Sequence, residues 1–521
     1  MSIELKREKI GVTRDNCASS IRVILDSDVI VPDTKPDAVK VLSVDATALV
    51  GDKYISKDYI TVTGTINYKI LYVGDGENKS AQSIDYFTPF SQQIDSKGAD
   101  ETMKCYVKCQ VGHVEHNIKN SRKINVKSAV DIDSRAYDMS EVSLISEVDG
   151  DIALPCRQNS VNNFNLKICQ ENCFEVNETV SLPETNPMAD EILKCSVKIK
   201  NDELKVVLNK VVAKGNILLS ALYKSDDNIY TSESEIPYTE ILNVDSVTPE
   251  MYTIAEYDVK DLSFSEKRDE EGKIASLDVG VNVYATIMSY EEKNISYISD
   301  IYCPDYELEI SKESLEVCEL VDTVTGQCVI NDNMSFSNSP DIEKIYSISS
   351  SAHVDSSKVV NNSVVVSGTA HVCLVGKLLS DEVSVTSSEK EIPFTYTMPV
   401  SREFNQSLGF ADTDAVLEHQ SFNIDGAGNV SLRLVIKLHS LVTENHKIDA
   451  VSDITYDENN RTDKSSQSGI TVYFVQNNDE IWDIAKRYHT TEEEIISVNR
   501  LDGNVVLTTG QQLIIPKRGR L

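Results

Sequence analysis

The segment 60–73, ITVTGTINYKILYV, decides how this sequence is read, because two later segments repeat its pattern. They are VVAKGNILLSALYK (211–224) and VVVSGTAHVCLVGK (364–377). In each copy a glycine follows a proline by 28 residues: Gly64 after Pro36, Gly215 after Pro187 and Gly368 after Pro340. Successive prolines are 151 and 153 residues apart. A spacing that recurs three times indicates one domain present in three copies.

The repeated segments have the pattern of β-strands. Residues 364–377 and 428–440 alternate apolar and polar side chains with a period of two, as half-buried strands do. A glycine inside such a pattern marks a bulge or a close backbone approach. Each copy also carries a proline next to an aromatic residue, in FTPFSQQI, EIPYTEIL and EIPFTYTM. The sequence therefore predicts a mainly β protein whose three repeats are β-sandwiches or barrels.

The repeat positions set the domain boundaries that we expect. The three copies span residues 1–147, 148–305 and 306–454. Residues 455–469, TYDENNRTDKSSQSG, are polar and predict a flexible linker. Residues 470–518 form a separate tail module.

The tail module has the pattern strand, helix, helix, strand, which is a small α+β fold. TVYFV alternates as a strand does, and QQLIIP predicts a closing strand that ends at Pro516. Between them, Ile481, Ile484, Ala485 and Tyr488 form one helical stripe. Asp479 is a candidate N-cap of this first helix. Thr490 or Thr491 can cap the second helix, with a glutamate three residues on completing a capping box.

Composition excludes several classes of function. The net charge of −33 opposes binding to nucleic acid or to acidic lipid through a generic basic surface. The first residues show no apolar signal segment, and no run of about 18 apolar residues predicts a membrane span. We therefore expect a cytoplasmic protein. Its eleven cysteines, an odd number, are then free thiols rather than disulfides or metal ligands. No nucleotide-binding or nucleophile motif occurs, so we expect no enzyme, no cofactor and no metal.

The tail module resembles a LysM domain. The resemblance rests on DEIWDIAKRYHTTEEEI (479–495), on Asn499 and on GQQLIIP (510–516). The sequence departs from the usual pattern in three places: Asn478 stands in place of glycine, Glu480 in place of threonine or serine, and TTGQ (508–511) in place of Y/R-P-G-Q. In glycan-binding members, the loops after the first strand and before the last strand form the sugar groove. An acidic Glu480 and a cytoplasmic location make glycan binding doubtful.

The same two loops supply our candidate partner-binding residues: Asn478, Asp479, Glu480, Ile481, Trp482, Asp502, Asn504 and Gln511. Trp482 is the single tryptophan of the chain and lies at the edge of the apolar stripe. It either packs against the small core or stands exposed as an aromatic anchor for a partner. Both roles are open from the sequence.

The repeats resemble the SPOCS domain of spore-coat-associated proteins. The resemblance is carried by VPDTKPDAVKVLSVDATALVGDKYISKDYITVTGTINYKILYV (31–73), and several copies followed by a LysM domain are typical of SipL-type coat morphogenetic proteins. It implies a non-enzymatic scaffold in the mother-cell cytoplasm, at the forespore surface, that recruits or anchors coat proteins. It also implies that the tail module binds the coat-assembly ATPase of the basement layer. Self-association is a further option, and a peptidoglycan-binding protein of the wall or cortex is the alternative.

Overall fold

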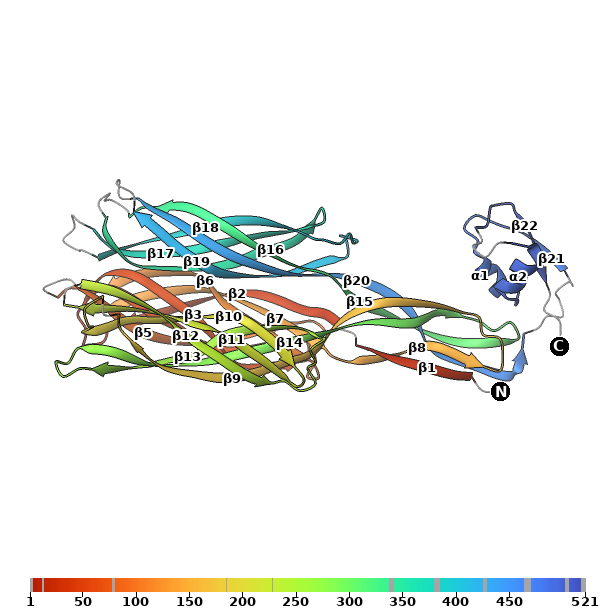
Figure 1. Cartoon of the computed structure of the whole chain (residues 1–521), viewed down its shortest axis with the longest axis horizontal. Helices are drawn as coiled ribbons and strands as arrows, with labels where there is room; N and C mark the ends of the chain where they lie inside the picture. Colours follow the sequence, from red (N-terminus) through yellow and green to blue (C-terminus); the bar gives the residue numbers. More distant parts are fainter. Residues whose placement is uncertain are drawn as a thin grey trace.

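A computed structural model describes most of the chain. The described residues are 3–11, 14–76, 80–183, 185–226, 228–336, 342–378, 385–424, 429–462, 470–501 and 506–516. They form a head of three repeats, a narrow stalk and the tail module beside the free end of the stalk (Figure 1). None of the helices in these ranges is long and apolar enough to cross a membrane.

Each repeat consists of two three-stranded antiparallel sheets that enclose an apolar core. This confirms the predicted β fold, and of the two expected alternatives it is the sandwich and not the barrel. The first repeat contains β2 (Arg14–Ile30), β7 (Lys123–Asp138) and β6 (Lys104–Asn120), and β3 (Ala38–Ser56), β4 (Tyr59–Gly74) and β5 (Ala81–Asp95). The second contains β9 (Cys156–Ser181), β14 (Ile274–Ile301) and β13 (Tyr252–Arg268), and β10 (Glu191–Val207), β11 (Lys210–Ser225) and β12 (Asn228–Asn243). The third contains β15 (Tyr306–Met334), β20 (Val430–Arg461) and β19 (Gly409–Ile424), and β16 (Ile342–Val360), β17 (Ser363–Leu378) and β18 (Val385–Pro399).

The repeated glycine marks a close approach between strands, as the sequence predicted. In every copy it pairs with the aromatic residue that follows the proline of FTPFSQQI, EIPYTEIL or EIPFTYTM: Gly64 with Phe90, Gly215 with Tyr238 and Gly368 with Phe394. A Cβ atom on Gly215 would lie 2.1 Å from the carbonyl oxygen of Lys200 and 2.9 Å from the hydroxyl of Tyr238. The two repeated sequence elements are thus one packing unit, in which glycine leaves room for the neighbouring backbone and an aromatic ring.

The three repeats pack against one another and share apolar clusters. In the head, equivalent residues of the three copies meet in one buried cluster, which includes Leu42, Leu193 and Tyr346. These residues are separated by the same 151 and 153 positions as the repeated prolines. Because equivalent positions meet at one place, the copies are arranged with approximate threefold symmetry around a common centre. Figure 1 shows their strands running along the same long axis.

Three two-stranded ribbons, one from each repeat, form the stalk. The first ribbon pairs β1 (Ile3–Gly11) with β8 (Glu141–Gly150), and the others pair the outer ends of β9 with β14 and of β15 with β20. Their apolar faces meet in clusters that include Ile145, Ile298 and Val451, one from each ribbon. The predicted linker was wrong in its first part, because β20 continues to Arg461 and pairs there with Tyr306. Ribbon pairing overrides the polar composition of residues 455–461, and residues 463–469 lie outside the described ranges.

The tail module has the predicted order of elements: β21 (Ile470–Phe474), α1 (Ile481–Arg487), α2 (Glu492–Asn499) and β22 (Gln512–Pro516). Its core contains Val475, Ile484, Ala485, Ile495, Leu513 and Ile515. The N-cap prediction for the first helix was wrong, because the cap is Glu480 and its side chain makes no capping bond. For the second helix, Thr491 is the N-cap and its hydroxyl accepts a hydrogen bond from the backbone N–H of Glu494, as predicted.

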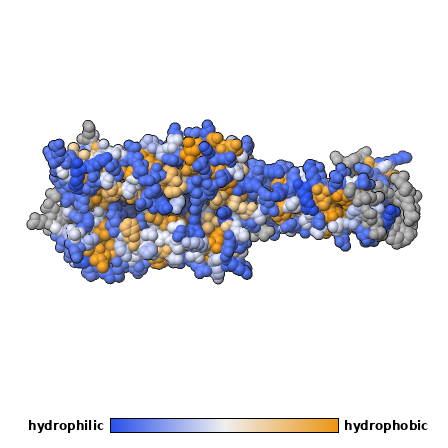
Figure 2. Space-filling model, turned by 90° about the horizontal axis from the view of Figure 1, so that it is seen from below, coloured by the Kyte–Doolittle hydropathy of each residue, from blue (hydrophilic) through white to orange (hydrophobic). Residues whose placement is uncertain are grey.

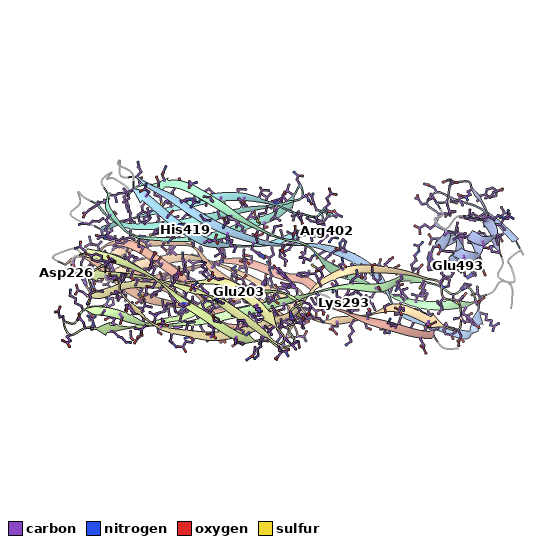
Figure 3. The ribbon with its side chains drawn as sticks, in the orientation of Figure 1. Glu203, Asp226, Lys293, Arg402, His419 and Glu493 are labelled. Carbon is purple, nitrogen blue, oxygen red and sulfur yellow. The ribbon has the colours of Figure 1, made fainter. Side chains whose placement is uncertain are left out.

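The outer surface is strongly polar. Figure 2 shows a mainly hydrophilic surface interrupted by separate hydrophobic patches. Charged side chains point outward from the head, the stalk and the tail module, as Glu203, Lys293 and Glu493 illustrate in Figure 3.

Candidate functional site: the tail module on the stalk, and the cavity between the repeats

The two loops predicted to bind a partner lie side by side. The backbone N–H of Val475 donates to the carbonyl of Gln511 at 3.0 Å, and the N–H of Gly510 donates to the carbonyl of Val475 at 2.8 Å. These bonds extend the pairing of β21 with β22 and hold residues 476–480 next to residues 506–511. Asp502 and Asn504 belong to the predicted set but lie outside the described residues.

Several predicted site residues form hydrogen bonds with other residues of the tail module. The Asp479 carboxylate accepts hydrogen bonds from the Tyr473 hydroxyl at 2.6 Å and from the Gln476 N–H at 2.7 Å, and these bonds lower its pKa. Gln511 accepts a hydrogen bond from the backbone N–H of Thr508 at 3.0 Å. Asn478 is exposed and adopts a left-handed backbone with φ of 67°, a conformation that asparagine tolerates well. Asp479 and Gln511 therefore stabilise the loops.

Trp482 is buried against the stalk, with only 3% of its surface exposed. Its indole Nε1–H donates to the carboxylate of Asp300, at the end of β14, over 2.9 Å. Lys486, one turn further along α1, donates to the same carboxylate over 2.8 Å. Burial alone would raise the pKa of Asp300, but the hydrogen bonds from Lys486 and Trp482 outweigh it and leave the pKa below its usual value.

Two more stalk residues complete the contact with the tail module. The ring of Tyr302 packs edge-on against the indole of Trp482 with centroids 4.9 Å apart, and its hydroxyl donates to the carbonyl of Thr490 at 3.0 Å. The guanidinium of Arg157 lies over the indole, 5.1 Å from the ring centroid, and pairs with the Glu480 carboxylate. Ile481 is partly buried against the core of the tail module. The structure thus places Glu480 and Trp482 at an interface with the second repeat.

Reasoning from the sequence missed the stalk side of this interface. Its one usable signal was an acidic residue at the same place in all three ribbons. This position is two residues after Ile145, Ile298 and Val451 and is occupied by Glu147, Asp300 and Asp453. On the stalk surface Glu147 pairs with Lys6, and Asp453 pairs with Arg7. Of the three acidic residues, Asp300 is the one that binds the tail module. The sequence could not show which ribbon the module would contact.

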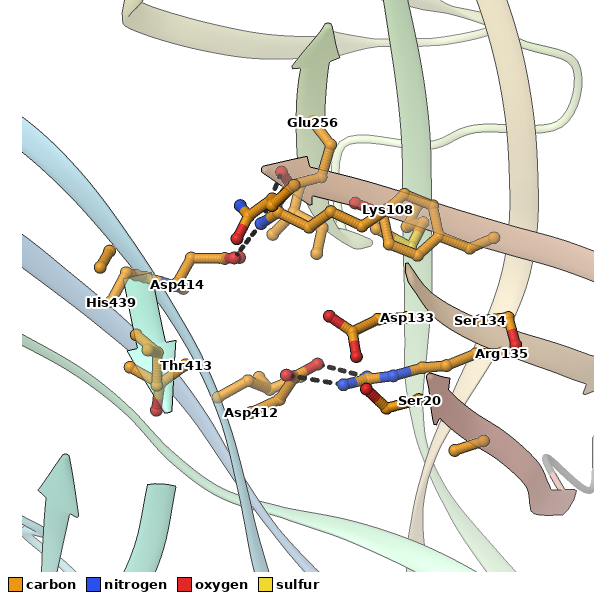
Figure 4. A pocket seen from close by; sticks show the side chains of 18 of the residues that line it. Ser20, Lys108, Asp133, Ser134, Arg135, Glu256, Asp412, Thr413, Asp414 and His439 are labelled. Atoms are coloured by element: carbon orange, nitrogen blue, oxygen red, sulfur yellow. Dashed lines mark hydrogen bonds and ion pairs between the residues drawn. The ribbon is translucent and has the colours of Figure 1, made fainter. Parts of the chain in front are cut away.

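A second feature is a cavity of about 350 Å³ where the three repeats meet, lined by both polar and apolar side chains (Figure 4). The Lys108 ammonium lies 2.7 Å from the Asp414 carboxylate and 3.9 Å from that of Glu256. These three residues come one from each repeat. They also occupy equivalent positions, because they pair with Asp133, Thr286 and His439, which are spaced 153 residues apart.

Lys108 and Asp414 carry opposite charges at this equivalent position. Burial, together with the neighbouring charge of Asp414, raises the pKa of Glu256 to about 8, so that Glu256 is mostly protonated at pH 7. Burial would also raise the pKa of Asp414, but the charge of Lys108 keeps it below its usual value. A second cross-repeat pair joins Arg135 to Asp412, with one of its two contacts at 2.8 Å. The described residues contain no group of three or more side chains suited to hold a metal ion.

Comparisons with known proteins agree with this architecture. The model of the SipL, SPOCS domain family matches residues 37–119, 188–267 and 341–425, one match in each repeat. The LysM domain model matches residues 473–516, so the tail module is a LysM domain. Neither family is catalytic. No curated protein and no solved structure matches the chain. With three SPOCS domains followed by a C-terminal LysM domain, the chain belongs to the SipL-type family of sporulation proteins.

Proposed function

We propose that this protein is a non-enzymatic scaffold of the spore coat that recruits or anchors coat proteins at the forespore surface. In this proposal the LysM tail module binds the coat-assembly ATPase of the basement layer. The family supports a coat-associated role in sporulation. The mother-cell cytoplasm, the ATPase and the other coat proteins as partners belong to the proposal.

One observation favours a protein over a glycan as the partner of the tail module. Two of the described loop side chains are engaged with other protein groups: Asp479 bonds with Tyr473 and Gln476, and Glu480 pairs with Arg157. A sugar groove needs polar groups that are free to exchange hydrogen bonds with hydroxyls. Here these groups stabilise the loops or bind protein, and the face built around Trp482 already recognises a protein surface.

The elongated shape supports a bridging role. The three repeats form a head at one end, and the tail module lies beside the far end of the stalk (Figure 1). A protein built in this way can hold two partners at a distance. Two attachments on one chain increase residence at a surface because release of one leaves the other bound.

Capture of the ATPase by the purified full-length chain tests the proposal. Removing residues 470–521 should abolish capture and forespore localisation, while circular dichroism should show that the β head is retained. Glu147→Gln, on the stalk surface away from the tail module, serves as a control that keeps both properties. Undiminished capture after the deletion would refute the assignment. Sedimentation of the full-length chain with purified peptidoglycan, without capture of the ATPase, would favour the glycan-binding alternative.

A further inference from the structure

The α1 face of the tail module is already occupied by the stalk of its own chain. We propose that this contact is an autoinhibitory latch: the segment Asp300–Tyr302 of the stalk covers the face that the protein partner of the tail module must use. The inference rests on the proposed function for the identity of that partner. The latch itself rests on the geometry of the contact.

Asp300 is the centre of the latch. Its carboxylate accepts the indole N–H of Trp482 at 2.9 Å and the ammonium of Lys486 at 2.8 Å, both from α1. A third donor, Lys312 of the neighbouring ribbon, lies 3.3 Å away and fixes the carboxylate from the stalk side. Hydrogen bonds to a charged group are stronger than hydrogen bonds between neutral groups. The Asp300 carboxylate therefore binds both Trp482 and Lys486 of the module strongly.

The contact covers a compact and chemically mixed face. Trp482 is enclosed by the ring of Tyr302 and the guanidinium of Arg157, and Arg157 also pairs with Glu480. Trp, Tyr and Arg at the centre of a buried patch are the residues enriched at strong protein–protein contacts. The stalk therefore shows what this face recognises: a carboxylate with an aromatic side chain beside it. A partner with that chemistry would compete directly with the stalk.

Most of the buried core of the tail module comes from the module itself. Its members include Val475 after β21, Ile484 of α1, Ile495 of α2 and Leu513 of β22. The stalk adds Tyr302 to one edge of that core. Opening of the latch would leave the contacts among these core residues of the module in place. A competing partner binds only the molecules whose latch is open, so its apparent affinity is the intrinsic affinity multiplied by the open fraction.

Trp482 makes the latch directly measurable, because no other tryptophan contributes to the fluorescence of the chain. In full-length protein, Asp300→Ala should shift the Trp482 emission to the red and increase its quenching by acrylamide. Asp453→Ala, at the equivalent position of the third ribbon, is the matched control and should leave both unchanged. Arg157→Met, which removes the cation above the indole, should act in the same direction as Asp300→Ala. Circular dichroism establishes that each variant keeps its β structure.

The effect on binding then tests autoinhibition. The Asp300→Ala chain should bind the ATPase with an apparent affinity raised by about fivefold or more, the lower range of typical coupling between sites. If both variants leave the emission and quenching of Trp482 as in wild type, the latch is refuted whatever the ATPase does. If the fluorescence responds and the affinity stays the same, the partner uses another face and autoinhibition is refuted. If the fluorescence responds but no variant binds the ATPase, the proposed partner is wrong and the latch stands.

Discussion

Replacement of Lys108 by methionine tests how the three repeats are held in their arrangement. The change replaces the unbranched stem by one of similar shape that is one atom shorter, and it removes the cation that lies 2.7 Å from the Asp414 carboxylate. It leaves a carboxylate between repeats without its counter-charge, while the apolar clusters of the head are untouched. The charge at this position, and not its volume, is therefore what the experiment probes.

The expected loss can be bounded from the geometry. Removing one partner of a fully buried ion pair costs about 3–5 kcal/mol, because the remaining charge is uncompensated. The Asp414 side chain keeps 45% of its surface accessible in the cavity, so screening reduces this value. We expect a loss of about 2 kcal/mol in the free energy of unfolding. Asp414→Asn in the Lys108→Met background should then cost less than in the wild type, since the pair is already broken.

Urea denaturation followed by far-ultraviolet circular dichroism measures the free energy of unfolding of the β head. The matched control is Lys6→Met, which removes the surface pair with Glu147, whose side chains are 63% and 59% exposed. Exposed pairs contribute at most about 1 kcal/mol, so the control should be almost neutral. The reasoning is refuted if Lys108→Met costs no more than Lys6→Met, or if the losses from Lys108→Met and Asp414→Asn simply add.

Three further predictions follow from other sites. Gly215→Ala places a Cβ atom 2.1 Å from the Lys200 carbonyl and should cost about 1–3 kcal/mol in urea denaturation, whereas Gly76→Ala, whose Cβ would meet nothing within 4 Å, should be neutral; equal effects would contradict the close-approach explanation. The folded protein holds the proton of Glu256 up to about pH 8, whereas the unfolded chain releases it near its ordinary pKa of 4.5, so this group makes the free energy of unfolding fall as pH rises between these values. Glu256→Gln should remove that decline and be more stable than wild type at pH 9. If the variant keeps the pH profile of the wild type, Glu256 is not the group responsible. Asn499→Ala removes the hydrogen bonds to both the N–H and the carbonyl of Ile514 and should destabilise the tail module by about 1–3 kcal/mol, measured by its tryptophan fluorescence during unfolding, with no such loss expected for Ser497→Ala.

The predictions from sequence succeeded where the signal is local and repeated. The 28-residue spacing from proline to glycine and the alternating strands were enough to predict three β domains, each a sandwich or a barrel. The glycine was expected to mark a bulge or a close approach, and its aromatic partner across the strand pair explains why the two elements recur together. The order of elements in the tail module and the cap at Thr491 were also predicted, because helix stripes and caps depend on neighbours within a few residues.

The predictions failed where a distant segment changes the role of a residue. Asp479 does not cap the first helix as expected, because its carboxylate accepts hydrogen bonds from the Tyr473 hydroxyl and the Gln476 N–H instead. Residues 455–461 were expected as linker from their composition, yet they extend a strand because a partner ribbon is available. The role of Trp482 stayed open because helix periodicity places it at the edge of the stripe and cannot supply the residues that cover that edge.

Sequence alone determined the number of domains, their β character, the family of each part and the acidic balance of the chain. These properties are written in patterns that extend over short stretches or recur at a constant spacing. Tertiary structure alone decided that the copies share a common centre, that Lys108, Glu256 and Asp414 meet there, and that Trp482 contacts Asp300. Such contacts join residues between 148 and 306 positions apart, and they depend on how whole domains pack, which no local pattern records.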